Sequence, residues 1–373
     1  MVGKRVAVSN KGFSLAESYD ISELQELLTR ASILNNTISD IPMLPQQASE
    51  MDTDIAVLSI SGTASLEGNA FSEDDIRTMI ITKHGKNYSA NQKTEIANLI
   101  KAYNQLDSTE TDGSPLIVTE DFIRSLHQTL TTGIDINGST PGQYRNKLIK
   151  VGSEEMGGVY RPPVKGIDLH MAQFIEWINS EEMLNASPYI RAALAHYQLS
   201  MIHPFFVGNG RTARLLEAHI LHSANVKHVA KMLSNHYYRH IDTYFKTFTS
   251  GRKGKKDITA FIKFVLEAVN ASLDELKNRV YGYLYDLTMR EYLCILKEDG
   301  DMNQRQHDLI LLMMDENRGI TLATLHTEKP FSYLYGKVTE QTARRDLKKL
   351  TDMRILTTKD NKTYEIGTDI LCF

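Results

Sequence analysis

The segment from residue 203 to residue 214, HPFFVGNGRTAR, constrains the fold of this chain more than any other stretch. Apolar, helix-forming sequence lies on both sides of it, and a proline and two closely spaced glycines interrupt that pattern. We therefore predict two apolar helices joined by a tight turn that leads directly into the second helix. Because a proline disfavours helical backbone angles in the residue before it, we expect His203 to lie on an extended stretch.

The turn has the chemistry of an anion-binding site. Gly208 and Gly210 can adopt backbone angles that point successive N–H groups into one concavity, and the helix N-terminus that follows also favours phosphate. Arg211 and Arg214 lie three residues apart on one face of that helix, where each guanidinium group can bind phosphate oxygens in pairs. The alternative interpretation is a structural turn whose arginines pair with acids on a neighbouring helix.

A histidine beside a phosphate site is placed to act as a general base for an incoming hydroxyl group. His203 therefore adds a catalytic group to the anion site, and the segment as a whole indicates phosphoryl or nucleotidyl transfer. The segment is not a Walker loop, because it contains neither GxxxxGKS nor GxxxxGKT.

The same string resembles the signature of Fic-domain proteins, His-Pro-Phe-x-Asp/Glu-Gly-Asn-Gly-Arg-x-x-Arg, and departs from it at one specified position, Val207. The surrounding sequence is similar as well: GQYR at 142–145, AHYQLSMIHPF at 195–205, and Leu-Ser at 233–234 ahead of Tyr244. The resemblance covers roughly residues 20 to 270. It implies a mainly α fold with a helical Fic core and a small β-hairpin flap.

The resemblance also implies an activity, the transfer of AMP from ATP to a Ser, Thr or Tyr hydroxyl of a protein, including the enzyme itself, with release of pyrophosphate. His203 would then be the base that deprotonates the hydroxyl. The Gly-Asn-Gly turn would hold the α- and β-phosphates, and the two arginines the β- and γ-phosphates. The residues that we expect in the nucleotide site are Gly208, Asn209, Gly210, Arg211, Thr212, Ala213, Arg214 and Tyr244.

The stretch from residue 148 to residue 163 breaks the helical pattern of the chain. Two short β-rich runs flank Met156-Gly157-Gly158, which predicts a hairpin with a glycine turn. By the resemblance, the hairpin near 149–160 would be the flap that holds the target segment by strand addition. The flap residues that we select are Lys150, Val151 and Gly152.

Val207 stands where the family has an acid that holds Mg²⁺ between the α- and β-phosphates. Valine cannot bind a metal, but Mg²⁺ often keeps several waters and binds partly through substrate phosphates. We therefore expect weaker Mg²⁺ binding and predict no protein metal site at this position. An active enzyme with a high metal requirement, a nucleotide-binding regulator and a variant reaction all stay open.

Residues 63 to 69, TASLEGN, resemble the inhibitory motif of the family, Ser/Thr-x-x-x-Glu-Gly/Asn. The motif residues are Thr63, Glu67 and Gly68, and by the resemblance Glu67 pairs with Arg214 and blocks the γ-phosphate. A charge-assisted hydrogen bond of about 1.5–3 kcal/mol is strong enough for such a brake, because about 2.7 kcal/mol shifts a two-state equilibrium a hundredfold. Two alternatives are an ordinary glycine cap at a helix end and a role of the same glutamate in AMP removal.

The composition sets outer limits on what the chain does. With 42% hydrophobic and 24% charged residues, it is not a disordered or fibrous protein. Its formal net charge of −4 excludes a globally basic nucleic-acid coat. Two cysteines make no disulfide framework, and the start of the chain has no apolar signal region, so we expect a soluble, cytoplasmic protein without a membrane partner. His236 and His240 have the spacing of metal ligands, but no third ligand accompanies them.

Three helical patterns and a hairpin after residue 298 resemble a winged helix-turn-helix, with TEQTARRDLKKL in the place of the recognition helix. Residues 336 to 362 contain eight basic and four acidic residues, which gives a local basic patch. The candidate DNA contacts are Thr342, Arg344, Arg345 and Lys348. The alternatives are a protein-docking module and a homodimer element.

We thus predict three regions: a helical arm with the inhibitory motif (1–112), a Fic core (113–297) and a winged-helix module (298–373). The first hypothesis for the function is a self-inhibited protein adenylyltransferase that uses ATP. The second is a nucleotide-sensing, DNA-binding transcriptional regulator with a weak or inactive Fic core. His203 favours the enzyme, and Val207 favours the regulator.

Overall fold

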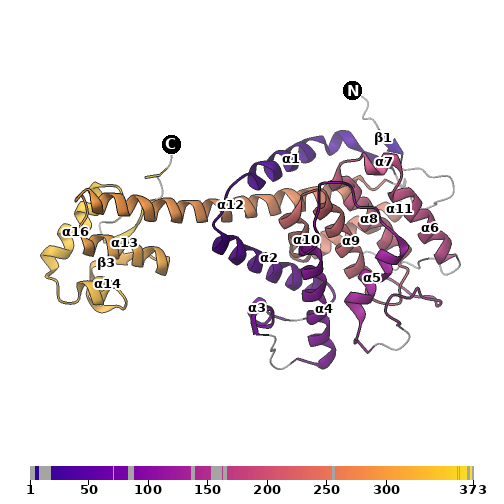
Figure 1. Cartoon of the computed structure of the whole chain (residues 1–373), viewed down its shortest axis with the longest axis horizontal. Helices are drawn as coiled ribbons and strands as arrows, with labels where there is room; N and C mark the ends of the chain where they lie inside the picture. The colour runs from indigo at the N-terminus through magenta and orange to yellow at the C-terminus, as the bar shows by residue number, and fades with distance from the viewer. Residues whose placement is uncertain are drawn as a thin grey trace. The chain divides into compact units, whose positions relative to one another are not determined.

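The computed structural model describes residues 5–7, 18–69, 71–82, 88–135, 139–152, 162, 166–253, 257–358, 360, 362–367 and 370–371. The protein is mainly helical, as the sequence predicted (Figure 1). It divides into two compact units, Met1–Lys277 and Asn278–Phe373. This division falls earlier than the boundary predicted at 297/298, and the three predicted regions stay a prediction.

In its described residues, unit 1 consists of helices and one short antiparallel pair of strands, in which Arg5 lies opposite Asp20. Its strands and first helices are β1 (Arg5–Ala7), β2 (Ser18–Asp20), the 3₁₀ turn η1 (Ile21–Glu23), α1 (Gln25–Ser39), α2 (Pro45–Leu66), α3 (Glu73–Thr82), α4 (Ala90–Asp107) and α5 (Glu120–Thr131). The helices that follow are α6 (Ile167–Ile178), α7 (Glu181–Leu184), α8 (Pro188–Ile202), α9 (Asn209–Ser223), α10 (Lys227–Arg239), α11 (Ile241–Lys253) and α12 (Thr259–Glu298), whose last residues belong to unit 2.

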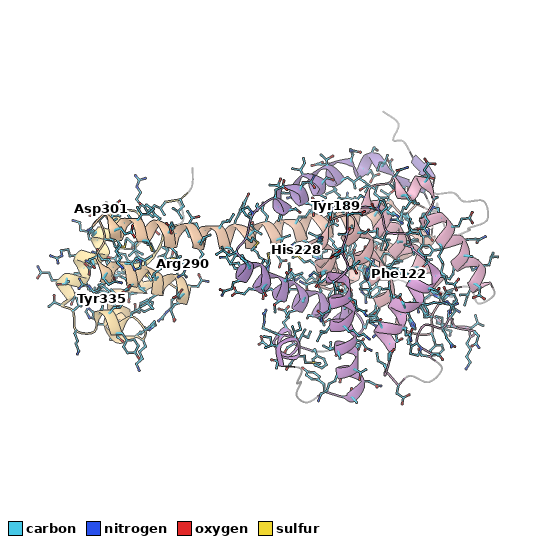
Figure 2. The ribbon with its side chains drawn as sticks, in the orientation of Figure 1. Phe122, Tyr189, His228, Arg290, Asp301 and Tyr335 are labelled. Carbon is cyan, nitrogen blue, oxygen red and sulfur yellow. The ribbon has the colours of Figure 1, made fainter. Side chains whose placement is uncertain are left out.

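Helices α8 and α9 pack against each other in the core of unit 1. Nearly every residue of both helices is buried, including Tyr189 at the start of α8, and Figure 2 shows the side chains that surround it. Helix α9 also buries Arg211, Arg214 and Glu217. Because buried charged side chains are rare unless they have partners, α9 is the element in which a functional site is most expected.

Helix α2 packs along α10 with its backbone in close contact. A Cβ atom on Gly62 would lie 2.4 Å from the backbone nitrogen of Asn235, so only glycine fits at this position. The next residue of α2 is Thr63, and Glu67 is the residue that ends the helix. The close approach at Gly62 therefore fixes where the end of α2 lies relative to the helices around it.

Helices α4 and α5 pack against each other and against α9. Ser89 and Gln92 form a reciprocal cap at the start of α4, and Thr119 caps α5. These caps satisfy N–H groups that the first turn of a helix leaves unpaired. The caps thereby fix where α4 and α5 begin, and these two helices contain Glu95 and His127.

Unit 2 has a three-stranded sheet in the order β3-β5-β4, with both pairs antiparallel. Its core contains Phe331 and Tyr335, both fully buried, and Figure 2 labels Tyr335. Its elements after α12 are α13 (Gln304–Glu316), β3 (Ile320–Thr321), α14 (Leu322–Thr327), α15 (Ser332–Tyr335), α16 (Glu340–Asp352), β4 (Leu356–Thr357) and β5 (Thr363–Ile366).

The structure differs from the sequence predictions at His203 and describes only part of the predicted hairpin. His203 does not lie on an extended stretch: it ends α8 in the left-handed region, with φ 51° and ψ 58°. Its N–H still donates to the carbonyl of Leu199, so it continues the helical hydrogen bonding for one more residue before the chain turns. Most of the hairpin predicted near 149–160 lies outside the described residues, which include only its first residues, up to Gly152.

Within the described part of the chain, no helix combines the length and the hydrophobicity that crossing a membrane requires.

Candidate active site

A cavity of about 540 Å³ opens in unit 1 around the turn between α8 and α9. Its wall combines His203, the Gly-Asn-Gly turn and the two arginines at the start of α9 with Tyr244 of α11. Glu67 at the end of α2 and three residues of α4 line it as well. The cavity thus brings together residues from elements that are far apart in the sequence. The α4 residues are Asn91, Gln92 and Glu95.

The turn is held in shape by Asn209, which is buried. Its side-chain oxygen accepts from the N–H of Phe205 and its amide group donates to the carbonyl of Phe205, both at 2.9 Å. Gly208, with φ 75°, is the residue that precedes α9, and a Cβ atom there would lie 3.0 Å from Thr131. Because no side chain caps α9, its first N–H groups are left for an anion.

His203 lines the cavity, and its ring is oriented by the helix that it ends. Nδ1 lies 3.1 Å from the carbonyl oxygen of Ser200. A carbonyl oxygen only accepts hydrogen bonds, so Nδ1 carries the proton and Nε2 of the neutral ring carries the lone pair. This tautomer is the one that a general base needs.

Arg145 holds the same helix end from the other side and is itself buried. Its Nε donates to the carbonyl of His203 at 2.7 Å, and its backbone N–H donates to the carbonyl of Pro204 at 2.9 Å. The last carbonyls of a helix have no partner within the helix, so a buried arginine there satisfies them and fixes the backbone of His203. Arg145 belongs to the GQYR string that the sequence comparison singled out.

His127 of α5 supports the turn through two hydrogen bonds. Its Nδ1 accepts from the N–H of Gly142 at 2.9 Å, so its Nε2 carries the proton and donates to the carbonyl of Val207 at 3.0 Å. Its ring stacks on Phe205, with 3.7 Å between the ring centroids. Burial lowers the pKa of His127 to about 4, so the ring stays neutral and keeps these two hydrogen bonds at neutral pH.

Two guanidinium nitrogens of Arg214 contact residues of α2 and its end. Its Nη2 pairs with Oε1 of Glu67 at 2.7 Å, and its Nε donates to the hydroxyl of Thr63 at 2.9 Å. Burial opposes ionisation of Glu67, but the charges of Arg214 and then Arg211 outweigh it and hold the pKa of that carboxyl below its usual range. The ion pair implied by the inhibitory motif is therefore present, and both partners are charged at neutral pH.

Arg211 is also paired, although to a different helix. Its Nη1 lies 2.5 Å from Oε1 of Glu95 in α4. The other carboxylate oxygen of Glu95 accepts from the side chain of Asn69 at 2.8 Å. Both arginines of the signature thus have acidic partners on neighbouring helices. This pairing is also what the alternative interpretation predicts, in which the turn is purely structural.

Tyr244 connects the cavity to a buried polar network. Its hydroxyl lies 2.9 Å from Nε2 of His196, whose Nδ1 donates to Glu217 at 3.0 Å. Tyr237 donates to the other oxygen of Glu217 at 2.9 Å. Burial raises the pKa of Tyr244 to about 12, so the hydroxyl stays neutral. Because Nε2 of the neutral His196 ring accepts the proton of this hydroxyl, the Tyr244 oxygen can only accept a hydrogen bond from a ligand.

The structure does not bring every selected residue to the cavity. Thr212 and Ala213 are buried inside α9, and the Thr212 hydroxyl donates to the carbonyl of Gly208 at 2.8 Å. Neither residue lines the cavity. Of the flap residues, Val151 and Gly152 line it, whereas Lys150 is exposed and does not.

The donors around Val207 do not fit a metal held by the protein. Its side chain is aliphatic and its carbonyl already accepts from His127. The two carboxylates that line the cavity, Glu67 and Glu95, are each paired with an arginine. Within the described ranges, no group of three or more His, Cys, Asp or Glu residues could hold a metal ion, and His236 and His240 stack on each other with ring centroids 4.2 Å apart.

Among the residues of the site that were not selected from the sequence are Glu95, His127 and Arg145. Glu95 lies among polar residues of α4 that are typical of a solvated helix face, so no pattern distinguishes it. His127 does have a signal, because it lies on the apolar face of α5 beside Leu126 and Leu130. Arg145 lay in a string already noted as similar to the family, but it had no assigned role.

The Fic/DOC family model matches residues 117–221, which include the whole turn and all but the last two residues of α9. The chain is 27% identical over 255 residues to the protein adenylyltransferase Fic of Culex quinquefasciatus, covering 67% of this chain and 47% of that relative. It is 30% identical over 283 residues to the protein of the same name from Drosophila mojavensis, covering 74% and 48%. The chain thus spans about half the length of the curated relatives it matches.

Solved structures share the fold. Fic-1 from C. elegans superposes with a TM-score of 0.58 at 21% identity, covering 69% of this chain and 73% of that one. A Fic family protein from Desulfovibrio desulfuricans G20 superposes with a TM-score of 0.56 at 17% identity, covering 92% and 96%. At these identities the likeness concerns the fold alone.

Proposed function

The chain carries a Fic domain of the Fic/DOC family, and from this premise we propose that it is a protein adenylyltransferase held inactive by its own Glu67. Relatives that match two thirds or more of this chain bear the name protein adenylyltransferase Fic. The observation that carries the proposal is the cavity in which His203 lines one wall together with the N-terminus of α9 and two buried arginines.

In the proposed reaction, Nε2 of His203 takes the proton from a Ser, Thr or Tyr hydroxyl of the target protein. The hydroxyl oxygen then forms a bond to the α-phosphorus of ATP, and the bond from that phosphorus to the bridging oxygen of the β-phosphate breaks. AMP remains on the protein, and pyrophosphate leaves with the electron pair of the broken bond. His203 keeps its orientation throughout because Ser200 and Arg145 hold it.

The N-terminal N–H groups of α9 and the guanidinium of Arg211 are the groups proposed to bind the phosphates. They stabilise the negative charge that moves onto pyrophosphate as the bond breaks. Because the donors around Val207 do not fit a protein-held Mg²⁺, we assign no step to a metal ligand of this chain. Val151 and Gly152 line the cavity, which supports the proposal that the flap binds a target segment beside it.

The brake follows from the partners of Arg214. With Glu67 at 2.7 Å and Thr63 at 2.9 Å, this guanidinium is turned toward α2 and its charge is compensated. A γ-phosphate would have to displace a carboxylate of the same sign of charge. The Glu67–Arg214 pair therefore opposes the binding of the complete triphosphate.

The reaction is tested with ATP labelled either at the α- or at the γ-phosphate. Glu67→Gly should incorporate label into protein from α-labelled ATP only, and Glu67→Gly/His203→Ala should lose incorporation while still binding ATP. Label from γ-labelled ATP would indicate phosphoryl transfer instead. Normal ATP binding by Glu67→Gly without any incorporation would contradict the proposal and favour a nucleotide-sensing regulator.

A second function is proposed for unit 2, in which β3 lies between α13 and α14 and the strands β4 and β5 follow α16, an order similar to that of a winged helix-turn-helix. Arg345 and Lys348 of α16 are exposed, whereas Arg344 pairs with Glu340 at 2.6 Å. Thr342 lies in the first turn of α16, where Thr339 caps the helix. We propose that this face contacts DNA phosphates, and we retain a homodimer as a prediction.

Binding of a mixed-sequence duplex by the full chain, measured by fluorescence anisotropy, tests this second function. The affinity should fall as salt rises and should drop further for Arg345→Ala/Lys348→Ala. No binding at low salt would leave unit 2 as a protein-docking module.

A further inference from the structure

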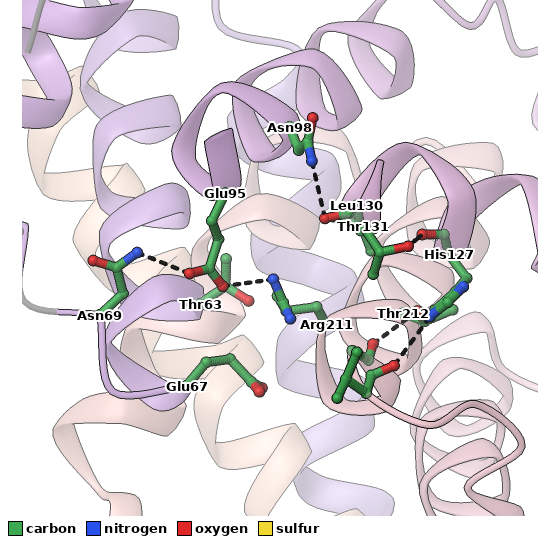
Figure 3. A network of polar contacts seen from close by, with 12 residues as sticks. Thr63, Glu67, Asn69, Glu95, Asn98, His127, Leu130, Thr131, Arg211 and Thr212 are labelled. Carbon is green, nitrogen blue, oxygen red and sulfur yellow. Dashed lines mark hydrogen bonds and ion pairs between the residues drawn. The ribbon is translucent and has the colours of Figure 1, made fainter. Parts of the chain in front are cut away.

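Glu95 of α4 faces the phosphate-binding end of the cavity, although it lies outside the Fic signature and outside the inhibitory motif. Figure 3 shows its carboxylate between Asn69 and Arg211, each of which comes from a different part of the chain. The distances are 2.8 Å to the side-chain nitrogen of Asn69 and 2.5 Å to Nη1 of Arg211. Both carboxylate oxygens are therefore engaged, and the carboxylate is fixed in one position.

The two arginines of α9 differ in how their partners hold them. Arg214 uses both its Nε and its Nη2 on α2, where Thr63 and Glu67 take them. Arg211 makes one side-chain ion pair, and its buried Nε has no hydrogen-bond partner among the described residues. An unpaired donor on a side chain that is only 7% exposed and lines a cavity is costly unless a ligand satisfies it.

This difference gives Glu95 and Glu67 opposite effects. Glu67 withdraws Arg214 from a ligand, because it takes the donors that a phosphate would need. Glu95 holds Arg211 through Nη1 and leaves the rest of the guanidinium of this cavity-lining side chain for a ligand. A planar guanidinium that is fixed at one nitrogen has lost most of its rotational freedom before a ligand arrives, which reduces the entropy cost of binding.

We propose that Glu95 is a positioning residue that presents Arg211 to the phosphates of the nucleotide, with Asn69 as its anchor. The proposal rests on the proposed function for the identity of the ligand, a nucleoside triphosphate. Asn69 lies two residues after Glu67 in the sequence and is buried. The end of α2 therefore affects both arginines. Glu67 pairs with Arg214 directly. Asn69 acts on Arg211 through Glu95.

The test measures ATP binding directly by calorimetry in the Glu67→Gly background, so that the brake does not interfere. Glu95→Ala should raise the Kd for ATP about tenfold, because Arg211 loses the contact that orients it. Glu95→Gln should have a smaller effect, because its amide oxygen still accepts from Arg211. Asn69→Ala, which does not line the cavity, should raise the Kd about threefold.

Asp274→Asn serves as the matched control, because Asp274 pairs with Arg30 at 2.6 Å and does not line the cavity. Its Kd should equal that of Glu67→Gly. Thermal unfolding of each variant shows that it is folded, and Glu95→Gln preserves the shape of the side chain should Glu95→Ala fail to fold. In the transfer assay, Glu95→Ala should raise the KM for ATP more than it lowers kcat.

An unchanged Kd in Glu95→Ala or Glu95→Gln would overturn the positioning role. A lower Kd in both variants would also overturn it and would make Glu95 a competitor of the phosphates. If Glu67→Gly binds ATP but does not transfer AMP, the proposed function fails while the Kd values still decide the role of Glu95. If Glu67→Gly does not bind ATP, both proposals are wrong.

Discussion

At the residue scale, the site depends on side chains whose protonation is fixed by what they touch. Nδ1 of His203 donates a hydrogen bond to the carbonyl of Ser200, and the ring of His127 is kept neutral by burial. Glu67 stays ionised because Arg214 and Arg211 stabilise its charge. The ring of His127 is therefore neutral and the carboxylate of Glu67 is ionised across the neutral pH range, as their proposed roles need.

The brake should not respond to pH in that range. The pKa of Glu67 is lowered in the folded protein, so its contribution is present above the ordinary carboxyl range and is lost only as the pH falls through the lowered value. The ratio of the transfer rate of Glu67→Gly to that of the wild type, measured from pH 6 to pH 9, should be constant. A ratio that falls steadily within this interval would show that another group controls the brake.

Val207 is the residue that sets the metal requirement in this account. Val207→Asp in the Glu67→Gly background adds a carboxylate, which is a preferred ligand of Mg²⁺. We expect the Mg²⁺ concentration for half-maximal transfer to fall about tenfold or more. Val207→Asn, which adds a neutral oxygen at similar size, is the control and should have a smaller effect. An unchanged requirement in Val207→Asp would mean that position 207 does not face the metal.

At the element scale, the end of α2 is placed by its contact with α10. Gly62 lies against the backbone of Asn235, one residue before the Thr63 that binds Arg214. The inhibitory contacts therefore depend on how closely two helix backbones approach, which is a property of the helix pair and not of the motif itself.

Gly62→Ala should push α2 away from α10 and loosen the brake. The added Cβ would lie 2.4 Å from a backbone nitrogen, and overpacking of this kind costs about 1–3 kcal/mol. We expect a lower unfolding temperature together with a higher transfer rate than the wild type. Gly282→Ala in α12 is the matched control, because nothing lies within 4 Å of its Cβ position, and it should not lower stability. A destabilised Gly62→Ala protein with unchanged transfer would show that the brake does not depend on this contact.

The elements around the signature could be predicted from the sequence to a large extent. The two apolar helices, the turn and the resemblance of TASLEGN all identified residues that the structure brings to one cavity. Glu95 could not be found, because its role depends on which face of α4 packs toward α9, and periodicity alone does not give that. The backbone of His203 was predicted wrongly, because the carbonyl contacts that allow a left-handed helix end are made by Arg145, which lies 58 residues earlier.

At the scale of the whole molecule, each unit has its own core, and the chemistry is confined to unit 1. Unit 1 buries charged and polar side chains in its central helix, which makes its stability sensitive to protonation. Three histidines of unit 1 have their pKa lowered by burial to about 4, namely His127, His219 and His236.

Unit 1 should therefore lose stability in mild acid. Between the ordinary value of 6.5 and about 4, the unfolded chain takes up protons that these folded histidines do not, so the free energy of unfolding falls as the pH falls. Each histidine contributes a slope of about 1.4 kcal/mol per pH unit. Chemical denaturation of the full chain at several pH values measures the slope, and His219→Gln should reduce it. An equal slope in that variant would contradict the assignment of His219.

The pair of Glu67 and Arg214 is proposed to hold an otherwise assembled AMP-transfer site inactive. The most direct measurement is the rate of AMP transfer from α-labelled ATP by the wild type and by Glu67→Gly, side by side at saturating Mg²⁺. A charge-assisted hydrogen bond of about 1.5–3 kcal/mol predicts that the variant is faster by about ten- to a hundredfold. Equal rates in the two proteins, with ATP bound by both, would contradict the claim.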